Sequence, residues 1–197
     1  MARIGFKKAK YNKHTTTGKY ATLEDSKVPE FVEVQEEKFA PEYNNAELYG
    51  NDSLVESDTT FKKGSLTITV VDDNDEIDAE LLGSDISTET TSKGEVSMNI
   101  KDTAPEVGYG HIIPKIVNHQ YKYKVEFFPR VKFSKITHDS KTRGENVEFT
   151  VSTIEGTVYP LDKEFNGIPE GTWEKHKTFD SYSDAETYLD TLLTPTA

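Results

Sequence analysis

The amino-acid sequence predicts a mainly β protein, with two packed antiparallel sheets, a flanking C-terminal α-helix and one short helix. Apolar and polar residues alternate along 65–71, 120–133 and 147–151, as in strands with one wet and one dry face. Helix signals occur at 75–82 and at the C-terminus. The length suits a single domain over 1–197 that can bury a core without disulfides or metals.

Charge is spread unevenly along the chain, whose formal net charge is −12. Residues 1–27 contain seven basic and two acidic residues, whereas residues 28–100 contain four basic and eighteen acidic residues. A basic segment beside an acidic one suggests contact between neighbouring copies, and an ordinary solvated acidic surface explains the same counts. Tight binding to nucleic acid is disfavoured, because that binding depends on basic patches that displace counterions from phosphates.

Composition also excludes several kinds of protein. The chain has no cysteine, so it has no disulfide framework, thiolate metal site or cysteine nucleophile, and it suits a reducing cytoplasm. No apolar run approaches the roughly 18 residues that span a membrane. No apolar stretch follows the basic N-terminus, so a signal peptide is not expected.

The first third of the chain is expected to hold strands separated by a long polar connection. A short strand at Ile4–Tyr11 is followed by a loop and an extended arm, which together form an N-terminal arm over 1–29. Mixed alternation at 31–39 predicts a second strand. The polar segment 39–63 is rich in turn-forming residues and is expected to be a long, irregular loop or a hairpin.

The middle of the chain predicts the short helix and one more strand. Acidic residues near Asp75 complement the helix dipole, and Gly83 suits the helix end. A loop rich in Ser and Thr follows at 84–93. A strand is then expected at 94–101, with one face formed by Val96, Met98 and Ile100.

The second half carries the strongest β signal and the best helix. Pro129 interrupts the alternating segment 120–133 and is expected at a bulge or a sheet edge. Ser183 and Glu186 form a capping box ahead of the last helix. Trp173 is expected to anchor that helix to the core or its flank. The apolar stripe of the helix consists of Ala185, Tyr188, Leu189 and Leu192.

A search for reactive or ligating residues assigns no catalytic, cofactor-binding or metal-binding residue, so an enzyme is not expected. No two histidines share helical spacing, and His111 is expected to have a surface or hydrogen-bonded role. The acidic run 72–78 lacks the glycine of a calcium loop. Gly108-Tyr109-Gly110 lacks the third glycine of a dinucleotide fingerprint and is interpreted as a strand with close backbone approach or a bulge.

Several segments taken in order resemble the major tail proteins, or tail tube proteins, of long-tailed bacteriophages that infect Gram-positive bacteria. The resemblance covers about residues 45 to 193 and is weaker over 1–44. It rests on the order of the motifs, since each is weak alone. The segments are Asn45–Asp52, Val55–Asp58, Ser65–Val71, Ala104–Gly110, Tyr123–Phe133, Lys141–Glu145, Val147–Thr157, Trp173 and Thr178–Asp180, followed by the last helix.

The resemblance implies a structural protein of the virion, assembled in the host cytoplasm. It implies two sheets packed nearly orthogonally, an inner β-barrel closed across a hexameric ring, and rings stacked into a tube that conducts DNA during ejection. Its partners would be further copies, the tape measure protein and the tail terminator, and DNA would pass without specific binding. The segments 1–29 and 39–63 would bridge subunits and rings. The family supplies no catalytic or cofactor residues.

Electrostatics agrees with this role, and other roles stay open. An acidic lumen repels phosphates, so the acidic residues of 28–100 are expected to supply much of the lumen charge. Another β-rich assembly or adhesion module is the main alternative, such as a capsid-decorating protein, a secreted adhesin or the tube of an injection machine. A hydrolase that uses paired carboxylates is a further alternative, although the sequence lacks the corresponding motifs.

Overall fold

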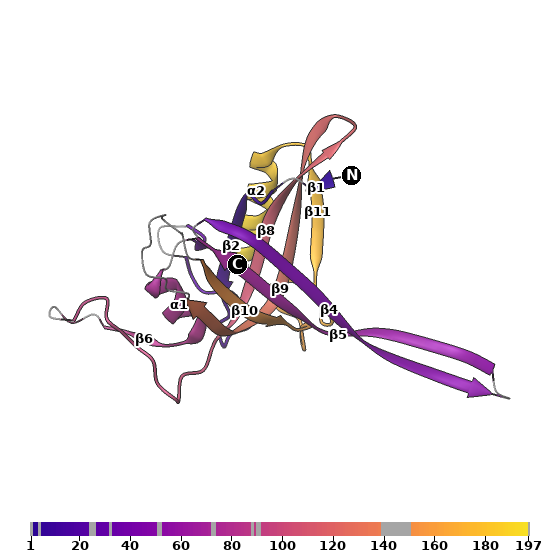
Figure 1. Ribbon diagram of the computed structural model, residues 1–197, viewed down its shortest axis with the longest axis horizontal. Helices are drawn as coiled ribbons and strands as arrows, with labels where there is room; N and C mark the ends of the chain where they lie inside the picture. The colour runs from indigo at the N-terminus through magenta and orange to yellow at the C-terminus, as the bar shows by residue number, and fades with distance from the viewer. Residues whose placement is uncertain are drawn as a thin grey trace, which may run out of the picture.

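The computed structural model describes residues 2–3, 5–23, 27–31, 33–50, 53–71, 74–87, 89, 92–138 and 151–196. It confirms a mainly β chain with two antiparallel sheets and two helices (Figure 1). The elements are β1 (Ala2–Arg3), β2 (Lys8–Lys13), β3 (Glu30–Phe31), β4 (Val34–Gly50), β5 (Ser53–Val70), α1 (Asp75–Leu82), β6 (Asp85–Ile86), β7 (Val96–Ser97), β8 (Glu106–Val117), β9 (Gln120–His138), β10 (Ser152–Val158), β11 (Lys175–Phe179) and α2 (Tyr182–Leu193).

The two sheets are unequal in size. The described strands form one nine-stranded sheet, with the order β3-β2-β8-β9-β10-β5-β4, and β1 and β11 attach to it at β8 and β9. The second sheet contains only β6 and β7. The large sheet curls, because Phe31 near one end and Ile68 near the other belong to the same buried core. This curled sheet therefore supplies both layers around the main core.

Strand β9 turns the sheet, and Pro129 lies at the turning point. One side of β9 pairs with β8, while the other side pairs first with β11 and then, beyond Pro129, with β10. The β8–β9 register shifts between Val107 and Tyr109, so two β9 residues, Pro129 and Arg130, lie opposite the single β8 residue Gly108. Proline has no N–H to donate, so it fits a position where regular pairing is interrupted. The predicted bulge at Pro129 is confirmed.

Helix α2 covers the outer face of the β8–β9 pair. Ala185, Leu189 and Leu193 are buried there against a second core that includes Ile112 and Phe127. The predicted capping box is wrong: the helix begins at Tyr182, and its N-cap residue makes no side-chain hydrogen bond to the helix. The helix therefore starts before the predicted cap, and its buried stripe recurs every four residues.

Other sequence-based predictions are corrected in detail. The strand predicted at Ile4–Tyr11 overlaps β2 only at 8–11, and β1 lies before it. The strand predicted at 31–39 is divided between β3 and β4. The strand predicted at 94–101 shrinks to β7, with Met98 and Ile100 exposed, because β6 is the only strand that pairs with β7 in the described chain. The strand predicted at 147–151 lies outside the described residues except for its last residue, which precedes β10.

The predicted N-terminal arm over 1–29 is also revised, because part of it belongs to the sheet. Strand β2 pairs with β3 on one side and β8 on the other, and it buries Tyr11. Lys8 Nζ lies 2.8 Å from Glu186, and Lys10 Nζ lies 2.6 Å from Asp190, so α2 neutralises this basic segment. These lysines are already paired within the chain, which removes the basis for a free basic arm at 8–13.

The close approach of α2 to β8 gives a first testable prediction. A Cβ added at Gly110 would lie 2.5 Å from Leu189 Cδ1 and 3.2 Å from the Glu126 carbonyl oxygen. Gly110→Ala should therefore displace the helix and lower the free energy of unfolding by about 1–3 kcal/mol, measured by urea denaturation. Ser134→Thr adds a methyl group on an exposed strand position and should change stability by less than about 0.5 kcal/mol.

A double variant tests the cause of this loss. Leu189→Ala vacates the space that the new methyl group needs, so the double variant should lose less than the sum of the two single losses. Additive losses would show that Gly110 is not constrained by the helix.

Candidate assembly hairpin and the buried charges at its base

Strands β4 and β5 form a long β-hairpin that extends beyond the body of the protein (Figure 1). Pairing continues from Val34 opposite Val70 to Gly50 opposite Ser53, with register shifts along the way. The side chains of residues 40–47 and 57–60 are all exposed. The segment 39–63 is therefore a paired hairpin, as one of the two sequence-based alternatives stated, and not an irregular loop.

The distal half of the hairpin, residues 44–60, has a polar sequence, and its described side chains, at 44–47 and 57–60, are exposed. It contains four acidic residues and no lysine or arginine. An isolated two-stranded hairpin is at best marginally stable in water. The body of the protein must therefore hold the base of this hairpin firmly.

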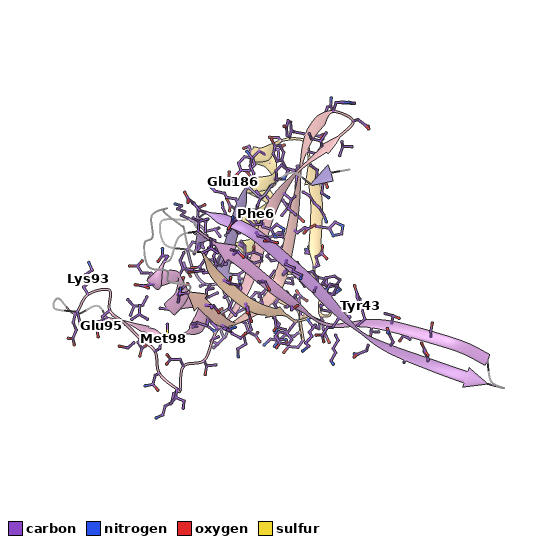
Figure 2. The ribbon with its side chains drawn as sticks, viewed as in Figure 1. Phe6, Tyr43, Lys93, Glu95, Met98 and Glu186 are labelled. Atoms are coloured by element: carbon purple, nitrogen blue, oxygen red, sulfur yellow. The ribbon has the colours of Figure 1, made fainter. Side chains whose placement is uncertain are left out.

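Aromatic stacking provides one part of that hold. The rings of Phe61 and Trp173 stack with centroids 4.2 Å apart, and Phe39 lies 5.9 Å from the same tryptophan. Gly64 makes room for Phe39, since a Cβ there would lie 2.3 Å from Phe39 Cε2. Tyr43 contacts Phe61 edge to face as the hairpin leaves the body (Figure 2). Trp173 therefore packs at the base of the hairpin and not against the last helix, which corrects its predicted role.

A buried bridge of charged side chains provides the second part. Strand β4 contributes Glu37, whose Oε2 lies 2.9 Å from His111 Nδ1 in β8 and accepts a 2.7 Å hydrogen bond from Tyr109 Oη. On the other side of the ring, His111 Nε2 lies 3.3 Å from Glu126 Oε2 in β9. Lys124 donates to the other oxygen of Glu126. The bridge therefore ties β4 to the inner face of β8 and β9.

Burial and charge act on the histidine in opposite directions. The side chain of His111 is only 2% exposed, and Phe6 stacks on its ring with centroids 5.3 Å apart. Burial lowers the pKa of His111, but the carboxylates of Glu37 and Glu126 outweigh it and raise the pKa to about 9. Burial also raises the pKa of Glu126, yet His111 and Lys124 together lower it to about 2. At neutral pH His111 is therefore protonated and Glu126 is ionised.

The bridge is suited to holding structure, because it joins side chains from three strands. A protonated imidazole between two carboxylates has no lone pair with which to act as a general base. A cavity of about 590 Å³ opens beside it, lined by both charged and apolar residues. Within the described residues, no group of three or more His, Asp or Glu side chains could hold a metal ion. In the same part of the chain, neither helix is long and apolar enough to cross a membrane.

Sequence reasoning did not find this bridge. It expected His111 at the surface or in a hydrogen bond, and the residue is buried between two ionised partners. The alternation in 120–133 predicts Glu126 on the polar face of its strand, and the mixed pattern at 31–39 assigns no face to Glu37. One feature of the sequence could have revealed the bridge: a histidine lies within the apolar strand 107–113. A polar side chain that is buried in such a strand needs a buried partner.

The outer edge of the hairpin strand is a second notable feature. In the part of the chain that the structure describes, β4 pairs only with β5, and β11 pairs only with β9. Residues from both strands, including Glu36 and His176, line the cavity beside the bridge. Strand edges with free backbone donors and acceptors are templates for pairing with another chain.

Comparison with known proteins adds no family assignment. No protein-family model matches the sequence, and no curated protein matches it.

The bridge predicts a pH dependence of stability. The pKa of His111 is higher in the folded state than the ordinary value of 6.5, so its contribution is full below pH 6.5 and is lost as the pH rises through about 9. Between those values, the free energy of unfolding should fall by on the order of 3 kcal/mol, measured by denaturation at fixed ionic strength.

A histidine variant is the control for this titration. His111→Asn should be less stable than the wild type at pH 6 and should lose most of the dependence between pH 6.5 and 9. If that variant kept the full pH dependence, another group would be responsible and the bridge would not be ionised as described.

Proposed function

We propose that this protein is the tail tube subunit of a long-tailed bacteriophage, which assembles into stacked hexameric rings and forms the conduit for DNA. The observation that carries the proposal is the β4–β5 hairpin, a long polar extension clamped to the body by aromatic stacking and a buried ionised bridge. Ordering a long exposed segment of backbone costs conformational entropy. Contacts made by the hairpin during assembly would offset that cost. The motif resemblance assigns the same segment, 39–63, to contacts between subunits and rings.

The free sheet edges fit the same proposal. A ring of copies that joined β4 of one subunit to a strand edge of the next would close the sheets into a barrel and leave no edge exposed. The body supplies a firm platform for that joint, since β4 is tied to β8 and β9 through Glu37 and His111. Stacking of such rings is a contact between unlike surfaces, which propagates into a filament.

The charge distribution supports a conduit over a binding protein. Residues 28–100 carry eighteen of the thirty-five acidic residues of the chain and only four basic ones. A lumen wall of that composition would repel phosphates and let DNA slide without being held. The proposal includes the tape measure protein and the tail terminator as partners inside and at the end of the tube.

Shortening the hairpin tests this function. Tyr43 and Phe61 are directly opposite each other, so an Asn-Gly turn can replace residues 44–60 and close the strands with a two-residue loop. The shortened protein should keep the thermal stability of the wild type to within a few degrees, because the base contacts are retained. It should remain monomeric at concentrations where the wild type forms tubes, measured by sedimentation velocity and negative-stain electron microscopy.

The result that would contradict the assignment is tube formation by the shortened protein. A matched control replaces the exposed loop residues Lys163 and Glu164 with alanine, which leaves the hairpin unchanged and should leave tube formation unchanged.

A further inference from the structure

One face of the layer formed by β4, β5, β10 and the second half of β9 carries rows of hydroxyl side chains. Residues that are directly opposite each other in an antiparallel sheet have neighbouring side chains on the same face. The register therefore defines three successive rows across these strands. Their hydroxyl residues are Thr69, Thr153 and Thr137, then Thr67, and then Ser65 and Thr157. We call the surface formed by the three rows the hydroxyl face.

The hydroxyl face carries little net charge, although the net charge of the chain is −12. The other positions of the rows hold two acids, three lysines and one alanine, namely Glu36, Glu155, Lys38, Lys132, Lys135 and Ala40. On the central strands β5 and β10, the rows contain five hydroxyl residues and one charged residue, Glu155, which lies 3.3 Å from Lys135 Nζ. The middle of the face is therefore a block of short, uncharged polar side chains.

The outer faces of the two layers differ in what covers them. Helix α2 packs on the outer face of β8 and β9, where Leu189 is buried. Helix α1 contributes Leu81 to the main core, between the layers. The hydroxyl face is open to solvent in the monomer, since Ser65 is exposed and the five threonines are half-buried. One layer is therefore capped by a helix, and the other presents a bare sheet face.

A ring of copies has more room at a large radius than near its axis. Joining copies through the free edge of β4 would extend the layer that carries the hydroxyl face around the ring. The other layer and α2 lie on the opposite side of this layer, and these bulkier parts fit at the larger radius. The hydroxyl face then points towards the axis.

We propose that the hydroxyl face is the wall of the DNA channel. The inference rests on the proposed function and identifies the surface along which the duplex passes. Short hydroxyl side chains exchange hydrogen bonds readily with water. They supply neither the cationic excess that holds phosphates nor the aromatic platforms that hold bases.

The hairpin adds negative charge to the same wall. Figure 1 shows β4 and β5 continuing from this layer into the projecting hairpin. Its distal residues, 44–60, contain four acids and no lysine or arginine. A wall that combines uncharged hydroxyl groups with these acids repels phosphates and lets the duplex slide.

Cysteine labelling tests this orientation, because the chain has no cysteine of its own. Ser65→Cys and Thr153→Cys each place a thiol on the hydroxyl face. Ser183→Cys and Thr191→Cys make the same two changes at exposed positions of α2 and serve as matched controls. The reagents are N-ethylmaleimide, which can enter a channel, and maleimide-activated albumin, which is too wide for a channel that fits one duplex. Urea denaturation confirms that each variant folds.

In assembled tubes, the albumin reagent should react at the two helix positions and be excluded from the hydroxyl face. Assembly should slow its reaction with Ser65→Cys and Thr153→Cys by about tenfold or more, because modification needs an accessible thiolate. N-ethylmaleimide should still reach both positions in tubes, as measured by mass spectrometry. The same substitutions in the protein with the shortened hairpin give the reference rates for the single subunit.

The outcomes separate this inference from the proposed function. Tubes in which albumin labels the hydroxyl face as fast as α2 would place this face on the outside, which overturns the channel wall and leaves the tube function standing. Protection from both reagents would show that the face is buried between copies, which also overturns it. Helix positions that the albumin reagent cannot reach in tubes would contradict the outer position of α2. A wild type that forms no tubes would overturn the proposed function and this inference together.

Discussion

The buried bridge from Glu37 through His111 to Glu126 is the constraint on which the rest of the arrangement depends. Three charged groups from three strands meet in a low-dielectric interior, where a lone ionised group would be costly. The bridge is acceptable because each carboxylate has a second partner, Tyr109 for Glu37 and Lys124 for Glu126. It therefore fixes where β4 crosses the inner face of the sheet.

The position of that crossing sets the direction in which the hairpin leaves the body. Beyond the bridge, Phe39 and Phe61 stack on Trp173 at the point where the two strands leave the body. The strands then continue with exposed side chains at 40–47 and 57–60. A loosely held hairpin would lose conformational entropy on every docking event. Rigid anchoring of the hairpin base lowers the conformational entropy that docking costs. The fixed base therefore favours assembly.

The sequence predicted the elements that depend on local pattern. Helix α1, the alternation in β5 and β9 and the bulge at Pro129 follow from periodicity, caps and proline chemistry. It could not predict features that depend on distant partners. The ion pair of His111 cannot be predicted from its own strand, because its partner Glu37 comes from β4. The packing of Trp173 was predicted wrongly because its contact with Phe61 depends on the position of β5.

The central claim is that the hairpin makes this chain a tube-forming subunit, and electron cryomicroscopy of the purified protein at high concentration tests it most directly. The account predicts hollow tubes of stacked six-membered rings, with each β4–β5 hairpin seated on a neighbouring copy and the acidic residues of 28–100 prominent along the channel. Monodisperse single subunits under all conditions, or filaments without a channel, would contradict it.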